Sequence, residues 1–135
     1  MNREILFRGK RTDNGEWVEG FYWKDIWGDD TEYIYYDGES YKVIPETVGQ
    51  YTGLTDKNGK KIFEGDILES RASDNKKDWK YWIVTFYDGS FCFERDISRK
   101  RKHKYEQNLL CADEVKLYGL AVIGNIHDNP ELMEV

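Results

Sequence analysis

The chain has 135 residues, a length that predicts one domain with a core large enough to fold without disulfides or metal ions. Its net charge of −6 at pH 7, with 34% charged residues, predicts a soluble acidic protein and opposes general binding of nucleic acids. The two cysteines, Cys92 and Cys111, fit neither a disulfide framework nor metal-ligand spacing, which favours a reducing compartment. The first residues lack the apolar centre of a signal peptide, and no apolar run approaches the roughly 18 residues of a membrane span. We therefore expect a cytoplasmic protein without a membrane partner.

Strands are predicted along most of the first half of the chain. The sequence contains 5 Trp, 10 Tyr and 6 Phe but only 2 Pro, a composition that favours β-structure. We expect the first strand at residues 4–8, a turn at Asn14-Gly15 and a second strand at residues 17–23. A hairpin that turns at residues 37–40 should follow. Alternation along the second strand places four side chains on one face: Trp17, Glu19, Phe21 and Trp23.

The central stretch, residues 49–69, carries the strongest turn signals. Asn58-Gly59 lies between two segments that can extend, and because both residues tolerate φ > 0 we predict a type I′ turn. Gly65-Asp66 predicts a second tight bend, in which the aspartate carboxylate accepts backbone N–H bonds. A hairpin, a bend and a strand in this order are typical of small barrels.

The second half of the chain predicts strands and then short helices. Residues 81–87 form the strongest strand pattern, and Asp88-Gly89 turns it into a hairpin. A short amphipathic helix fits residues 105–118 loosely, with Gly119 as its left-handed cap, and Asn129-Pro130 is typical of a helix start. The chain thus predicts a mainly β fold. It is either a strongly bent antiparallel sheet or a small SH3-like barrel built from hairpins, with one or two short helices near the C-terminus.

Two pairs of side chains are candidates for acid–base chemistry. His127-Asp128 could be a base with its orienting carboxylate, and Glu64 with Asp66 could be an acid–base or magnesium pair. No nucleophile elbow accompanies His127, and adjacent residues of a turn point apart. Turn-forming roles are therefore favoured for both pairs.

Metal and thiol chemistry are also disfavoured. Asp56 begins a segment like a calcium loop, but Lys61 and Ile67 stand where such a loop requires Gly and Glu. No charge near Cys92 would activate its thiol. We expect no enzymatic activity, no cofactor and no metal ion.

The sharpest candidate for a binding site is a basic run. Five cations lie within residues 99–104, where they could neutralise phosphates: Arg99, Lys100, Arg101, Lys102 and Lys104. The balance of charge is uneven, since residues 1–48 hold 6 basic and 11 acidic side chains while residues 98–135 hold 6 of each. The run therefore has three interpretations: a solvated loop that offsets the acidic body, a contact for an acidic protein, or a nucleic-acid site.

Several blocks of sequence, in a consistent order and spacing, resemble the YopX family of phage and prophage proteins. They are residues 5–10 (ILFRGK), 50–54 (QYTGL), 56–59 (DKNG), 62–67 (IFEGDI), 122–127 (VIGNIH) and 129–132 (NPEL). The structural positions within these blocks are Gly53, Asn58, Gly59, Gly65, Asp66, Gly124, Asn125 and Pro130. The resemblance implies a small, single-domain YopX-like protein, residues 1–135, of phage or prophage origin in the bacterial cytoplasm. It implies no reaction.

Taken together, these patterns favour a non-enzymatic accessory protein that acts by binding a host or phage protein, or by self-association. The alternative is a nucleic-acid-binding module that uses residues 99–104.

Overall fold

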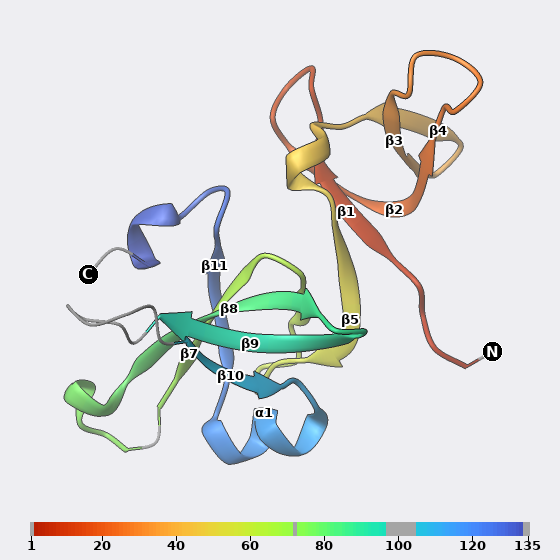
Figure 1. Cartoon of the computed structure of the whole chain (residues 1–135). Helices are drawn as coiled ribbons and strands as arrows, with labels where there is room; N and C mark the ends of the chain where they lie inside the picture. The colour runs from red at the N-terminus through yellow and green to blue at the C-terminus, as the bar shows by residue number, and fades with distance from the viewer. Residues whose placement is uncertain (1, 72, 97–104, 134–135) are drawn as a thin grey trace. The chain divides into compact units, whose positions relative to one another are not determined.

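The computed structural model describes residues 2–71, 73–96 and 105–133, and its elements are drawn in Figure 1. The chain divides into two compact units, an N-terminal unit (Met1–Gly53) and a C-terminal unit (Leu54–Val135), each of which is described by itself. Antiparallel strands dominate both units, which confirms the predicted mainly β fold. Whether the two units act as the single domain expected from the chain length stays a prediction.

The N-terminal unit is a sheet of hairpins. Its elements are β1 (Phe7–Lys10), β2 (Trp17–Lys24), β3 (Glu32–Tyr36), β4 (Glu39–Lys42), a 3-10 turn η1 (Pro45–Thr47) and β5 (Gly49–Thr55), which runs on past Gly53. The strands lie in the order β4-β3-β2-β1-β5, and the β1–β2, β1–β5, β2–β3 and β3–β4 pairs are antiparallel. Strand β2 carries two ladders, since residues 17–20 pair with β1 and residues 21–24 pair with β3.

The two ladders of β2 meet at Gly20. A Cβ atom at this position would collide with the carbonyl oxygen of Tyr35 in β3, so the close approach of the backbones requires glycine. Strand β2 is strongly curved (Figure 1). The bent antiparallel sheet is therefore the predicted alternative that agrees with the structure, while the SH3-like barrel stays a prediction.

One face of this sheet forms a small core. Val18, Ile34 and Val43 are buried there, and the side chains that pack against them are Phe7, Tyr22, Tyr41 and Val48. The alternation predicted for residues 17–23 is confirmed, because Val18 and Gly20 are buried while Glu19 and Phe21 are exposed.

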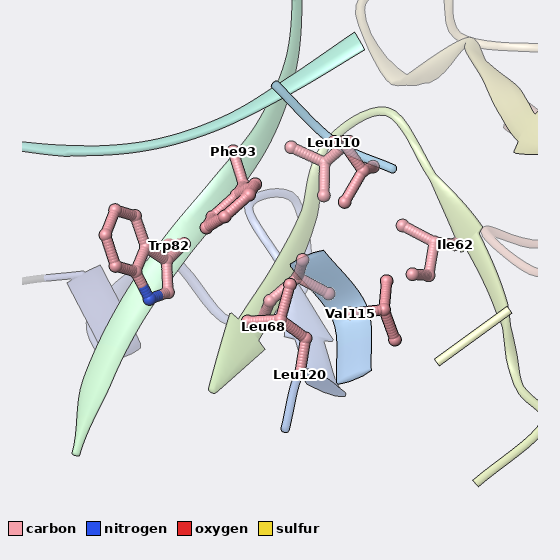
Figure 2. Close-up of a cluster of buried hydrophobic side chains, with 8 residues drawn as sticks. Ile62, Leu68, Trp82, Phe93, Leu110, Val115 and Leu120 are labelled. Atoms are coloured by element: carbon pink, nitrogen blue, oxygen red, sulfur yellow. The ribbon is translucent and has the colours of Figure 1, made fainter. Parts of the chain in front are cut away.

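The C-terminal unit has a second sheet, a helix and a larger core. Its elements are β6 (Lys61–Phe63), β7 (Asp66–Ser70), a 3-10 turn η2 (Lys76–Asp78), β8 (Lys80–Tyr87), β9 (Ser90–Asp96), β10 (Tyr105–Leu109), α1 (Ala112–Tyr118), β11 (Ala121–Asn125) and a 3-10 turn η3 (Pro130–Met133). Five strands lie in the order β10-β9-β8-β7-β11, and every pair is antiparallel. The core is formed by Ile62, Leu68, Trp82, Val84, Phe93, Leu110, Val115 and Leu120 (Figure 2).

Large aromatic rings lie inside this core. Trp82 and Phe93 are almost completely buried, and their rings meet edge to face at 4.9 Å between centroids. The Trp82 Nε1–H donates to Ser70 Oγ at 3.0 Å, which satisfies the polar end of the ring. The number of aromatic residues in the sequence did not show which of them are buried, and in the C-terminal unit Trp82 and Phe93 are.

The predicted turn type at Asn58-Gly59 is wrong. Gly59 has φ +82°, but Asn58 is not among the residues with positive φ, as a type I′ turn requires. The Gly59 N–H donates to the Asp56 carbonyl at 3.0 Å, the pattern of a type I turn followed by a left-handed glycine. Type I′ values occur at both Asp-Gly pairs, where Asp37 and Gly38 have φ 48° and 88° and Asp88 and Gly89 have φ 50° and 79°.

Two further boundaries differ from the sequence prediction. Strand β1 starts at Phe7 and continues through Gly9 to Lys10, because Gly9 and Lys10 pair with Val18 and Trp17 of β2. Residues 105–109 are strand β10 rather than helix, since pairing with β9 outweighs a weak helical pattern. The helix is shorter than predicted, and its left-handed cap at Gly119, φ 58°, is confirmed.

No helix in the described part of the chain is long and apolar enough to cross a membrane.

Candidate functional site

Asp56 holds the central hairpin in place. Its carboxylate is buried, and Oδ1 accepts the N–H groups of Asn58 at 2.8 Å and Lys60 at 2.9 Å. Oδ2 accepts the N–H of Val122 in β11 at 2.8 Å. Backbone donors therefore use the oxygens that a calcium loop would turn toward the ion.

The second bend is built as predicted. Gly65 has φ +85°, and the nearly completely buried Asp66 accepts the N–H of Phe63 through Oδ2 at 2.7 Å. Gly53 in β5 has φ +87° as well. Gly53 and Gly65 therefore have a conformational role, because only glycine adopts such φ values without strain.

The last motif block forms a turn around Asn125. Its Oδ1 accepts the N–H groups of His127 at 3.0 Å and Asp128 at 2.9 Å, and its Nδ2 donates to Asp128 Oδ2 at 3.2 Å. Gly124 is needed because a Cβ there would lie 2.5 Å from Asn129 Oδ1. Pro130 begins η3, as the sequence predicted.

The turn that carries His127 packs against the bend at Gly65. His127 Nε2 lies 3.5 Å from the position that a Cβ would take at Gly65, and the Ile126 N–H donates to the Gly65 carbonyl at 2.9 Å. Within residues 2–71, 73–96 and 105–133, no three His, Cys, Asp or Glu side chains are grouped to hold a metal ion.

The thiol of Cys92 is buried. Its pKa is raised mainly by burial and to a smaller extent by repulsion from Glu94 and Asp88, which disfavours the reactive thiolate.

The basic run at residues 99–104 lies outside the described residues, so its role stays a prediction.

A feature that the sequence analysis did not treat as a site is the outer face of β2 and β3. We define the aromatic face as Phe21, Trp23, Tyr33 and Tyr35. The register pairs Phe21 with Tyr35 and Trp23 with Tyr33, so the four rings form two cross-strand pairs. Phe21 is 65% exposed, Trp23 41% and Tyr35 43%. The sequence pattern that could have predicted this site is the series of aromatic residues at alternate positions of β2, which lie on the face opposite Val18.

Two of the four rings, Trp23 and Tyr33, are held in place by contacts with their neighbours. Trp23 and Tyr33 stack at 4.4 Å between centroids with 15° between planes, and Trp23 Nε1–H donates to Ser40 Oγ in β4 at 2.9 Å. On the opposite face, Tyr22 donates its hydroxyl to Glu32 at 2.7 Å. Burial, together with the bond to the Glu32 carboxylate, raises the pKa of Tyr22 to about 12, so the hydroxyl stays protonated at neutral pH.

The turn between β2 and β3 adds one more ring. Trp27 is 95% exposed in a bend that is closed by the Gly28 and Asp30 N–H groups, which both donate to the Asp25 carbonyl at 3.2 Å and 3.0 Å. Asp29 accepts the N–H and the hydroxyl of Thr31, and these bonds lower the pKa of its carboxyl group. The bend thus presents an indole ring close in sequence to the exposed carboxylates of Asp29 and Asp30.

A separate hollow of about 370 Å³ lies near the start of β2. It is lined by Arg11, Trp17, Val18, Glu19, Tyr36 and Tyr41. The chain's own cations already cover its rings, since Arg11 lies 4.4 Å from the Tyr41 centroid and Arg8 lies 4.7 Å from that of Trp17. Arg11 also forms a two-point pair with Asp13 at 2.6 and 2.9 Å. The charges at this hollow are therefore largely satisfied within the chain.

Comparison with known proteins identifies the relatives of the chain. A family model described as YopX protein matches residues 6–134. Protein EF1440 from Enterococcus faecalis has a crystal structure with 28% sequence identity and a TM-score of 0.65, over 98% of this chain and 100% of that one. The crystal structure of YopX from Bacillus subtilis is 19% identical, with a TM-score of 0.56 over 98% of each chain, and supports the fold alone. A search of curated proteins gives no match.

Proposed function

The chain belongs to the YopX family, and we propose that it is a non-enzymatic accessory protein of phage or prophage origin that binds another protein through its aromatic face. It would act in the bacterial cytoplasm, without a cofactor. The observation that carries this proposal is the aromatic face itself.

A group of exposed aromatic rings on one face of a sheet is typical of binding surfaces. Single exposed apolar side chains are common, but a contiguous group of them marks an interaction site. Trp and Tyr supply much of the binding energy at protein interfaces. The stack of Trp23 on Tyr33 and the bond from Trp23 to Ser40 reduce the conformational entropy that binding would otherwise remove.

Self-association through this face is less favoured than binding to a different protein. The N-terminal unit holds 6 basic and 11 acidic side chains, so two copies facing each other would bring like charges together. Nucleic acid would be repelled from this face by the same charge. The nucleic-acid alternative therefore depends on residues 99–104 alone.

The test is a pull-down from nuclease-treated bacterial lysate with two matched variants. The first variant carries Phe21→Ala and Tyr35→Ala, and the control carries Phe86→Ala and Leu109→Ala, both exposed apolar positions of the C-terminal unit. The proposal expects a stoichiometric protein partner that is lost with the first variant and kept with the control. It is overturned if the first variant keeps every protein partner, or if nuclease treatment removes them all.

A further inference from the structure

We propose that the aromatic face receives a protein segment rich in lysine and arginine. This inference rests on the proposed function and specifies the chemistry of the partner.

The charge around the aromatic face is strongly acidic. Residues 21–42 hold six acidic and two basic side chains, a balance of −4 within one hairpin and its turns. The exposed carboxylates among them are Asp29, Asp30, Asp37 and Glu39. The remainder of the chain, outside the N-terminal unit, is nearly neutral, with 14 basic and 15 acidic side chains. Most of the net charge of the protein therefore belongs to the unit that carries the aromatic face.

Two of these carboxylates flank β3, one of the two strands of the aromatic face. Asp30 precedes β3 and Asp37 follows it, so the two residues are separated by roughly 20 Å of extended chain. Tyr33 and Tyr35 lie between them on the exposed side. An apolar centre with charged ends is the usual anatomy of a protein interface, and here the charge of the rim has one sign.

The rings themselves suit a cationic partner. Lysine and arginine side chains bind over the faces of Trp, Tyr and Phe when they lie within about 6 Å. Elsewhere in the N-terminal unit Arg8, Lys10 and Arg11 already make such contacts with Trp17 and Tyr41. No cation of the described residues lies over Phe21 or Tyr35 in this way, so these two rings of the aromatic face are available to a partner.

The test uses two pairs of charge-neutralised variants of the full chain. Asp30→Asn with Asp37→Asn removes the charges that flank β3. Asp74→Asn with Asp88→Asn is the control, because Asp88 occupies the same type I′ turn position in the C-terminal unit, with φ 50° against 48° at Asp37. Asparagine tolerates this left-handed conformation, so both variants should fold.

Three labelled probes are titrated by fluorescence anisotropy: an Arg/Lys octapeptide, its Glu/Asp counterpart, and a peptide of residues 98–104 (SRKRKHK). We expect the octapeptide to bind and its acidic counterpart not to bind. Each aspartate removed from the face should weaken binding by up to about fivefold, as for an exposed ion pair. Tighter binding of the SRKRKHK peptide than of the octapeptide would identify a second copy of this chain as the occupant and overturn the proposal of an external partner.

Failure of the inference can be told apart from failure of the proposed function. If the Asp30→Asn, Asp37→Asn variant binds the octapeptide as tightly as the control, the inference is wrong. The proposed function would still be tested separately, by the pull-down with the variant of the aromatic face. Binding of the acidic peptide would also overturn the inference.

Discussion

The two units of this chain differ in where they place their tryptophan and phenylalanine rings, although each also has rings of the other kind, such as the exposed Phe86 and the buried Tyr51. The C-terminal unit buries Trp82 and Phe93 at the centre of its core, whereas the N-terminal unit has a core of Val18, Ile34 and Val43 and carries Phe21 and Trp23 outside. Burial of a large ring stabilises a fold, while exposure of one adds little to stability and favours contact with another molecule. The comparison teaches that the position of a ring on its strand, and not the number of rings, separates a core from a binding surface.

The largest expected effect is the loss of Trp82. Trp82→Ala should lower the free energy of unfolding by about 3–5 kcal/mol, because it leaves a cavity and removes the partner of Ser70 Oγ. Phe21→Ala is the matched change on the aromatic face and should cost less than about 0.5 kcal/mol. Chemical denaturation of both variants measures the difference. Equal losses would mean that Phe21 is part of a core and the contrast between the units is wrong.

A smaller effect is expected at the curve of β2. Gly20→Val should destabilise the N-terminal unit by about 1–3 kcal/mol, because its side chain would collide with the Tyr35 carbonyl. Amide hydrogen exchange can assign the loss to a unit. Protection should fall in β2 and β3 and remain in β7 and β8; a uniform fall would show that the two units unfold as one.

The central hairpin offers a sharper test of its turn. Gly59→Val should cost about 1–3 kcal/mol, because φ +82° strains a β-branched residue. Asn58→Ala should cost much less, since Asn58 has negative φ and contributes its backbone N–H to Asp56. Thermal denaturation separates the two variants. A large loss for Asn58→Ala would support the type I′ turn that the structure rejects.

The smallest expected effect concerns Tyr22 and pH. Its folded-state pKa, about 12, is raised above the ordinary value of 10.0, so folding favours the protonated hydroxyl. The resulting stability is fully present below pH 10 and is lost as the pH rises toward 12. Unfolding free energies of wild type and Tyr22→Phe, measured from pH 8 to pH 11.5, should show a steeper fall for the wild type. Parallel curves would mean that neither burial nor the bond to Glu32 raises the pKa of Tyr22 in the folded protein.

Much of the fold was predictable because local rules agree with it. Alternation fixed the faces of β2, turn residues located the hairpins at Asp37-Gly38 and Asp88-Gly89, and the bend at Gly65-Asp66 was correct down to the role of its carboxylate. These features depend on neighbours within a few residues, where steric and hydrogen-bonding preferences decide.

The remaining features depend on tertiary contacts, which local sequence patterns do not predict. Asn58-Gly59 can form more than one turn, and the carboxylate of Asp56 selects the observed one. Strand β10 exists because β9 lies beside it. The aromatic face was visible as a pattern of residues 17–23, yet only the exposure of Phe21 and Tyr35 turns that pattern into a candidate site.

The hydrogen bond between Asp56 and the distant Val122 has a consequence for synthesis on the ribosome. Its bond to the Val122 N–H spans 66 residues, and β7 pairs with β11 over a comparable separation. The hairpin at residues 56–60 therefore leaves the ribosome long before its buried acceptor can be covered, and at typical elongation rates the delay is on the order of several seconds. During that interval the nascent C-terminal unit has the Asp56 carboxylate in water and an unpaired edge on β7. The ladders that join β1 to β5 lie within residues 7–50, so they can form while the rest of the chain is still being made.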